Sequence, residues 1–162
     1  MNILPVKTKA QIKEIEKLAC IIWREHYKNI ISLEQIEYML EKFQSFEAIS
    51  AQISDGYIFC LLENEGVNLG YISYKTSENK LFLSKIYVLA DFRGRGYAKN
   101  AIEFLKKECA DNSCSKIWLT VNQNNINSIK TYEKMGFFNA RVQIADIGNG
   151  FKMEDFVMEL EI

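Results

Sequence analysis

The chain reads ADFRGRGYA at residues 90–98, between a run typical of a strand and a run typical of a helix. At such a junction the unpaired N–H groups of the helix start and the positive end of its dipole face outward. Glycine lets the backbone approach a phosphate closely, and two arginines add positive charge. These features predict a pyrophosphate-binding loop; a tight turn with exposed arginines is the alternative interpretation.

Two other phosphate loops are excluded by the letters around this stretch. A Walker loop needs the pattern G-x-x-x-x-G-K-[ST], which the chain lacks. A Rossmann fingerprint needs a third small residue three positions after Gly96, where the chain has Lys99. The loop also follows three predicted strands, whereas a Rossmann loop follows the first strand of a parallel unit.

Working outward from the loop, hydrophobic periodicity predicts helices and strands along the whole chain. The order is two helices and a short third one, three strands forming an antiparallel meander, then helix, strand, helix and two strands. Only the crossover through the helix after the loop must join parallel strands. We expect one domain over residues 1–162. The predicted helices cover 8–23, a second helix capped by Ser32, 45–54, 97–111 and 126–135, and the predicted strands cover 57–62, 67–75, 81–89, 116–121, 137–145 and 151–160.

Composition and charge argue against several kinds of partner and against a metal site. The chain has 162 residues, 20 basic and 21 acidic, and a formal net charge of -1, which argues against nucleic acid or an anionic membrane as a partner. One histidine, His26, and four scattered cysteines without a C-x-x-C pair make a metal site unexpected. No signal peptide and no membrane-spanning run is evident, so we expect a cytoplasmic protein.

Two motifs together resemble the GNAT superfamily of N-acetyltransferases. Arg93, Gly96 and Ala98 fill the pattern [QR]-x-x-G-x-[GA]. Some thirty residues on, residues 125–137 are similar to the family signature N-x-x-[AS]-x-x-x-Y-E-x-x-G-F. The resemblance covers nearly all of the chain. Within the superfamily, residues 83–88, 116–121 and 146–148 and the segment 23–27 look most like bacterial spermidine/spermine N-acetyltransferases.

This resemblance implies an α/β (α+β) fold with a mixed, mostly antiparallel sheet of about six to seven strands flanked by helices. The strand 81–89 would splay from the strand 116–121 in a V, and acetyl-CoA would lie there as co-substrate, with no metal. Its pantetheine arm would pair with the strand backbone like an added strand. The residues implied in binding acetyl-CoA are Ile86, Tyr87 and Val88 for the arm, Arg93, Gly94, Arg95, Gly96, Tyr97 and Ala98 for the pyrophosphate, and Asn125 and Ser128 on the last helix.

The chemistry implied is direct attack of a neutral amine on the thioester in a ternary complex. The leaving thiol has a pKa of about 8.5 and needs modest help from a general acid, which the resemblance assigns to Tyr132. Tyr132 also shares a helical stripe with Ile126 and Ile129, so a core role is the alternative. Asn125 holds the cofactor or, alternatively, caps its helix.

The general base stays unassigned. An alkyl amine with a pKa of about 10.4 is only on the order of one part in a thousand neutral at pH 7. Many members of the family carry a carboxylate on the strand before the loop, but here residues 81–90 contain no Asp or Glu. A water relay to Glu25, Glu34 or Glu37 and binding of the rare neutral amine are both open.

The first two helices are the expected acceptor region, since the family varies there. Aromatic faces and carboxylates could receive a cationic amine, a polyamine for preference, through ion pairing and cation–π contact. Alternatively the glutamate stripe is simply solvated. Acetylation of a protein N-terminus or lysine and a non-catalytic acyl-CoA sensor remain alternative functions, and the resemblance allows a homodimer. The candidate acceptor residues are Trp23, Glu25, His26, Tyr27, Glu34 and Tyr38.

Overall fold

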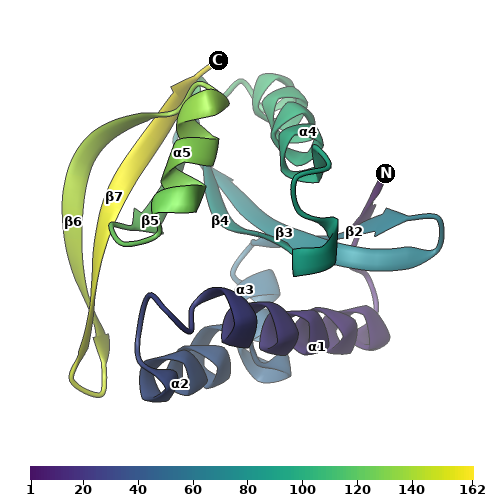
Figure 1. Ribbon diagram of the computed structural model, residues 1–162. Coiled ribbons are helices and arrows are strands. Elements are labelled where there is room, and N and C mark those ends of the chain that lie inside the picture. Colours follow the sequence, from purple (N-terminus) through teal and green to yellow (C-terminus); the bar gives the residue numbers. More distant parts are fainter. The chain divides into compact units, whose positions relative to one another are not determined.

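The structure is a computed structural model that describes residues 1–162. Its seven strands form one mixed sheet in the order β1-β2-β3-β4-β5-β7-β6, flanked by five α-helices (Figure 1). None of the helices is both long enough and apolar enough to cross a membrane. The elements are β1 (Asn2–Pro5), α1 (Lys9–His26), α2 (Leu33–Gln44), α3 (Phe46–Ser54), β2 (Ile58–Asn64), β3 (Val67–Ser77), β4 (Lys80–Val88), the 3-10 turn η1 (Ala90–Phe92), α4 (Tyr97–Asp111), β5 (Lys116–Asn122), α5 (Ile126–Lys134), β6 (Phe138–Gly148) and β7 (Phe151–Glu161).

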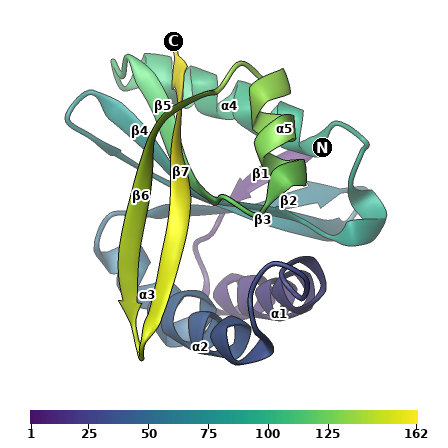
Figure 2. The same cartoon turned by 60° about the vertical axis from the view of Figure 1, so that its left-hand side comes forward.

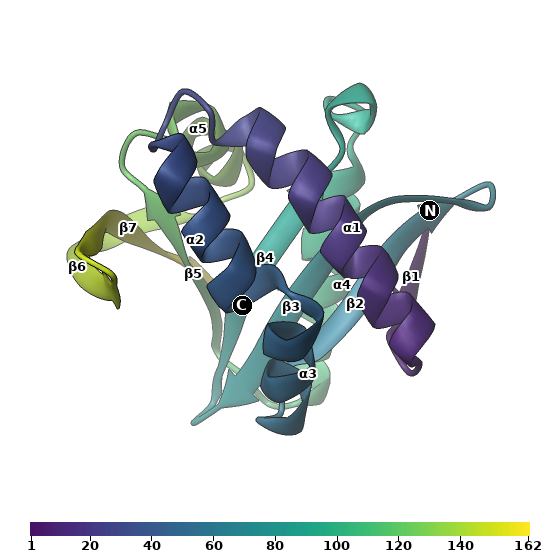
Figure 3. The ribbon, with the colours of Figure 1, turned by 90° about the horizontal axis from the view of Figure 1, so that it is seen from below.

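The chain folds into two compact units, and each is described by itself. The first comprises Met1–Lys75 and Lys85–Ile102. Its helices α1, α2 and α3 pack against one another on one face of its strands (Figure 3). Helix α1 begins at a capping box, in which the Thr8 hydroxyl accepts from the Gln11 backbone and the Gln11 side chain accepts from the Thr8 backbone. The core side chains that α1 contributes are Ile15, Leu18, Ala19, Ile22 and Trp23.

A close backbone approach within the first unit requires glycine at position 70. A Cβ there would lie 2.1 Å from the Tyr87 carbonyl oxygen and 3.0 Å from the Val88 Cα. The neighbouring bond from the Leu89 N–H to the Leu69 carbonyl (2.9 Å) holds the two segments at this separation. Gly70 therefore sets the course of the end of β4, just before the loop.

The second unit comprises Thr76–Ser84 and Glu103–Ile162. Strand β7 pairs antiparallel with both β5 and β6, and β6 and β7 run together as a long ribbon (Figure 2). Their hairpin turns at Asn149 and Gly150, which have positive φ of 53° and 77°. Positive φ at both central residues is what a tight Asn-Gly hairpin turn demands.

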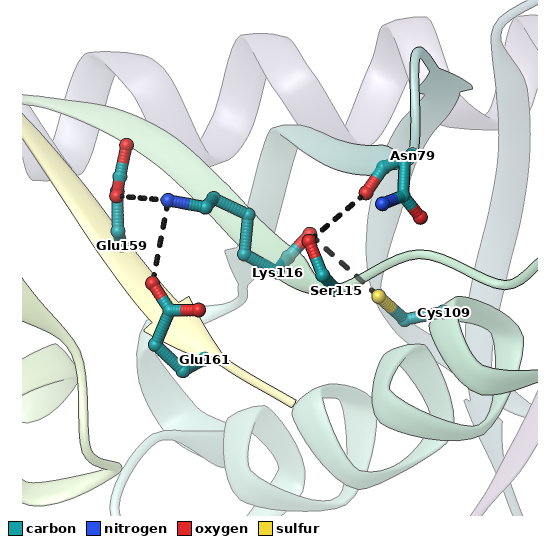
Figure 4. A network of polar contacts seen from close by, with 6 residues as sticks. All are labelled: Asn79, Cys109, Ser115, Lys116, Glu159 and Glu161. Carbon is teal, nitrogen blue, oxygen red and sulfur yellow. Dashed lines mark hydrogen bonds and ion pairs between the residues drawn. The ribbon is translucent and has the colours of Figure 1, made fainter.

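A network of polar contacts connects β5 to β7, to α4 and to the turn before β4 (Figure 4). The Lys116 ammonium lies 2.8 Å from Glu159 and 3.3 Å from Glu161 across the β5–β7 pair. The Ser115 N–H donates to the Asn79 carbonyl (2.9 Å), and the Cys109 thiol donates to the Lys116 carbonyl (3.6 Å). The start of β5 is thereby fixed to the end of α4 and to the turn before β4.

The expected fold is confirmed, with the parallel pairing at the predicted crossover. Strands β4 and β5 pair in parallel from Lys80–Lys116 to Phe82–Trp118, and the register ends there although both strands continue. Helix α4 has the predicted bounds, and the ambiguous segment 45–54 is a helix as predicted.

The main differences from the prediction concern β1, α1 and β6. The sequence analysis missed β1, which pairs antiparallel with β2 at the edge of the sheet. Helix α1 starts one residue later than predicted and runs three residues further, to His26. Strand β6 extends to Gly148, so the turn occupies two residues instead of 146–150.

Candidate functional site

The glycine loop leaves its backbone open to a ligand. Gly94 and Gly96 have φ of 75° and 83°, a region that side chains rarely adopt. A Cβ at either position would meet no atom within 4 Å, so the space beside them is free. Helix α4 starts at Tyr97, and the first intrahelical bond runs from the Asn100 N–H to the Gly96 carbonyl (3.0 Å). The N–H groups before Asn100 in this first turn therefore lack helical partners and can bind an anion.

The two arginines of the loop have different surroundings. Arg93 Nε donates to the Val88 carbonyl (2.9 Å), and its Nη2 lies 2.7 Å from Glu25 Oε2. The hydrogen bond from Arg93 holds the pKa of the Glu25 carboxyl below its usual value. Arg95 lies 5.4 Å from the centre of the Phe92 ring and makes no ion pair. Positive charge for a phosphate therefore comes from Arg95, whereas Arg93 fastens the loop to α1 and β4.

The predicted cofactor strand, Ile86–Val88, is half-buried at the end of β4. The Tyr87 hydroxyl lies 3.4 Å from the Tyr27 hydroxyl, and the Tyr87 ring lies 5.7 Å from the Trp23 ring. The Val88 carbonyl already accepts from Arg93, although a carbonyl oxygen has a second lone pair. Trp23, Tyr27 and Tyr87, which were all predicted as site residues, therefore lie together in one aromatic cluster in the first unit.

This cluster is packed tightly. Trp23 and Tyr27 lie with ring centroids 4.3 Å apart and are both buried. His26 meets the Tyr27 ring edge-on at 4.8 Å and is half-buried. The ring of the fully buried Tyr71 lies 5.4 Å from that of Tyr87, and its hydroxyl donates to Gln44 Oε1 (3.0 Å). Burial raises the pKa of the Tyr71 hydroxyl well above its usual value. Because these aromatic side chains are buried, they are better placed to line a site than to form its solvent-exposed opening.

The glutamates expected to form an acidic acceptor region are not gathered together. Glu25 is bound to Arg93, and Glu37 forms a two-pronged ion pair with Arg24 (2.7 and 2.9 Å) on the surface. The pKa of the Glu37 carboxyl is lowered chiefly by its hydrogen bond with Arg24. Glu34 is exposed, and Tyr38 is half-buried with the Lys42 ammonium 5.5 Å from its ring. The surface ion pair of Glu37 agrees with the solvated alternative, whereas Glu34 is exposed without an ion pair.

Lys85 lies on β4, before the loop, in a stretch without Asp or Glu. It is buried, and its ammonium donates to Gln52 Oε1 (2.6 Å) and lies 5.4 Å from the Phe59 ring centre. Gln52 is oriented by its own amide, which donates to the Phe43 carbonyl (3.0 Å). Burial lowers the pKa of Lys85 to about 8. The strand therefore presents a cation with an unusually low pKa instead of a basic carboxylate.

The second unit holds the predicted residues of α5. Asn125 is the N-cap residue of α5 and is buried, and its side chain makes no capping hydrogen bond. Ser128 is half-buried. Tyr132 is half-buried too, with its ring 5.7 Å from that of Phe137. Ile126 is 51% exposed, so the stripe through Tyr132 is not a continuous core stripe.

The sequence analysis missed Asp155, a buried carboxylate in β7. It is 8% exposed, and its Oδ1 has no hydrogen-bond partner. Burial alone raises the pKa of this carboxyl to about 6. A sequence signal exists, because in the alternating strand Asp155 occupies the same parity as the buried Met153 and Val157. An acidic residue at a core-facing position of a strand is unusual.

The comparisons with known proteins agree with this arrangement. A sequence model described as the acetyltransferase (GNAT) family matches residues 15–137. A curated relative, an uncharacterized N-acetyltransferase from Lactobacillus delbrueckii subsp. lactis, is 25% identical over 137 residues, which is 79% of each chain.

Among solved structures, the PaiA N-acetyltransferase of Thermoplasma acidophilum in complex with coenzyme A has a TM-score of 0.79 and 22% identity, with both chains fully covered. A spermidine N-acetyltransferase chimera that includes the Vibrio cholerae enzyme has a TM-score of 0.71 and 15% identity, covering 99% of this chain and 94% of the other. At these identities the likeness establishes the fold.

Proposed function

Since the chain belongs to the acetyltransferase (GNAT) family and is an acetyl-CoA-dependent N-acetyltransferase, we propose that it acetylates a small cationic primary amine of the polyamine type. We propose further that residues 1–162 act as a single catalytic domain. The observation that carries the transferase function is the open loop Arg93–Ala98, with free backbone N–H groups at the start of α4 and the unpaired guanidinium of Arg95.

The proposed path of acetyl-CoA follows this loop and the end of β4. The pyrophosphate binds the N–H groups of residues 93–98 with added charge from Arg95. The pantetheine arm pairs with the backbone of Ile86, Tyr87 and Val88. The family motif also proposes Asn125 and Ser128, at the start of α5, as residues that bind acetyl-CoA. The Asn125 side chain is buried and makes no capping hydrogen bond, which supports such a role.

The proposed chemistry is attack of the neutral amine on the thioester carbonyl. A strand N–H stabilises the negative charge that develops on the carbonyl oxygen. Tyr132 donates the proton that the departing thiolate takes up, and its half-buried position on α5 leaves it accessible to a substrate. Both roles rest on the family motif in this chain.

Support for a cationic acceptor comes from unpaired acidic side chains on α2. Glu34 and Glu41 are exposed and form no ion pair, and with Tyr38 they lie at helical spacing on one face. A polyamine carries several charges and could bind both carboxylates and the aromatic ring. Acetylation of a protein amine is the second candidate, favoured by the fact that Glu25 and Glu37 already have arginine partners.

The test is release of coenzyme A in the presence of spermidine, spermine, putrescine, amino acids and short peptides. Saturable turnover on the polyamines supports the proposed acceptor, whereas turnover on peptides alone favours the second candidate. Tight acetyl-CoA binding without turnover on any amine would point to a sensor.

Tyr132→Phe examines the assigned acid. We expect kcat to fall on the order of 10²-fold while the Kd of acetyl-CoA stays unchanged. Tyr57→Phe, a tyrosine outside the proposed site, is the matched control. Equal kcat values for the two variants would remove Tyr132 from the chemistry.

A further inference from the structure

We propose that Cys109 and Cys114 are a reversible disulfide site, at which a low-molecular-weight disulfide such as oxidised glutathione joins the two thiols in one intramolecular bond. Both residues lie in the second unit, Cys109 in the last turn of α4 and Cys114 in the turn that leads to β5. Both are free thiols in the structure, and neither takes part in the proposed acetyl transfer.

The way in which α4 ends brings the two cysteines together. Ser113 has a positive φ of 56°, the Ser113 N–H donates to the Ala110 carbonyl (3.0 Å), and the Cys114 N–H donates to the Cys109 carbonyl (2.8 Å). These two bonds around a left-handed residue define a Schellman motif. The motif brings the side chains at its two outer positions into contact, usually as two apolar residues. In this chain both positions are cysteines.

The backbone separation suits a disulfide. With standard backbone dimensions, the 2.8 Å bond keeps the Cα atoms of Cys109 and Cys114 within about 6.7 Å of each other. Disulfides join residues whose Cα atoms lie about 4.4–6.8 Å apart. The bond can therefore form without unfolding the turn.

The two thiols are also close enough to affect each other. Burial raises the pKa of the Cys109 thiol to about 11, and the Cys114 thiol adds to this shift through its charge and by hydrogen bonding. The Cys109 thiol donates to the Lys116 carbonyl at 3.6 Å (Figure 4). The Cys114 thiol donates to the Asn112 carbonyl at 3.8 Å. Since S–H groups are weak donors, oxidation of the pair sacrifices little hydrogen bonding.

A small oxidant reaches this pair from the side of Cys114. Residues 110–113 and Ser115 are exposed, and Cys114 is 7% exposed whereas Cys109 is 0% exposed. Backbone bonds at the end of a helix open more readily than those in its middle. Cys114 therefore meets the small disulfide first, and Cys109, which is protonated at neutral pH, reacts second.

The reaction is a thiol–disulfide exchange in two steps. Cys114 loses its proton to solvent, and its thiolate forms an S–S bond with one sulfur of oxidised glutathione. The S–S bond inside oxidised glutathione breaks, and the released thiolate takes up a proton. Cys109 then loses its proton and attacks the Cys114 sulfur, and the second glutathione leaves and is protonated. Two electrons pass to glutathione, the protein loses two hydrogen atoms, and the reverse exchange with reduced glutathione restores both thiols.

The experiment exposes the reduced, folded protein to oxidised glutathione, blocks the remaining thiols with iodoacetamide and examines a tryptic digest by mass spectrometry. Trypsin leaves both cysteines in peptide 108–116, whereas Cys20 lies in peptide 18–24. We expect peptide 108–116 to lose two hydrogen atoms and to resist alkylation until a reductant is added. Cys20, which is half-buried in the first unit, is the internal control and should stay a thiol or carry one glutathione.

Three serine variants separate the two steps. Cys109→Ser should retain one glutathione on Cys114, because no second thiol can displace it. Cys114→Ser should lose the disulfide and should leave the buried Cys109 without glutathione. Cys20→Ser, the matched control, should form the disulfide as the wild type does. The wild-type digest decides the question by itself if a variant at the buried Cys109 does not fold.

Alkylation of both cysteines in wild-type peptide 108–116 after oxidation would overturn the inference and leave an apolar contact at the end of α4. A lasting glutathione on wild-type Cys114 would overturn it as well, and so would bonds to Cys20, to Cys60 or to a second molecule in place of the pair. None of these readouts depends on acetyl transfer, so the proposed function is tested separately.

Discussion

Replacing Lys85 by methionine should change how the stability of the protein depends on pH. Lys85 is buried in the first unit, and burial lowers its pKa from 10.5 to about 8. The unfolded chain keeps the proton up to the ordinary pKa, whereas the folded protein releases it near pH 8. Between these values the unfolded state binds more protons, so the free energy of unfolding rises with pH.

The magnitude follows from the two pKa values. One pKa unit corresponds to about 1.4 kcal/mol, so the fall from 10.5 to about 8 costs the folded state about 3 kcal/mol at neutral pH. About 2 kcal/mol of this should be recovered between pH 7 and pH 9.5 as the folded lysine loses its proton. Methionine fills a similar volume and carries no proton, so it should remove this contribution.

Urea denaturation at several pH values between 7 and 9.5 measures the effect. The difference in unfolding free energy between the wild type and Lys85→Met should change by about 2 kcal/mol across this range. The exposed Lys107→Met is the matched control and should leave the wild-type pH dependence unchanged. Parallel curves for the wild type and Lys85→Met would refute the argument, because they would mean that burial does not shift this pKa.

Two further substitutions test the loop and its support. Glu25→Gln should lower the free energy of unfolding by less than about 1 kcal/mol, since the ion pair with Arg93 is partly exposed. Because Arg93 then loses its ion-pair partner, the KM of acetyl-CoA should rise several-fold. An unchanged KM would show that the ion pair does not support cofactor binding. Gly70→Ala places a Cβ against the Tyr87 carbonyl, which cannot move aside, so denaturation should show a loss of about 3 kcal/mol or more; wild-type stability would contradict the close approach.

The fold could be predicted well because its strongest signals are local. The apolar spacing between Tyr97 and Asp111 and the glycines before it define α4, and Asn149-Gly150 marks the hairpin. The edge strand β1 escaped prediction because it has four residues, includes Pro5, and owes its structure to pairing with β2. Short edge strands depend on their partners more than on their own composition.

The site was predictable only where a motif marks it. The loop and Tyr132 belong to sequence patterns, but Glu25 was assigned to the acceptor because its charge suits an amine. Its binding to Arg93 joins residues far apart in the chain, which no local pattern reveals. Asp155 was missed because its unusual feature is a buried carboxylate oxygen without a hydrogen-bond partner. That feature can be recognised only once the pairing of the strands is known.

Because Arg93 contacts both α1 and the end of β4, substitutions in α1 also affect the phosphate loop. One guanidinium contacts the Glu25 carboxylate in α1 and the Val88 carbonyl at the end of β4. If the first helices diverge to fit new acceptors, a change at Glu25 also loosens the loop, so substrate choice and cofactor affinity should show epistasis. Relatives that keep Arg93 but lose the acidic partner would need a compensating anion elsewhere, and a double-mutant cycle at Glu25 and Arg93 would measure the coupling.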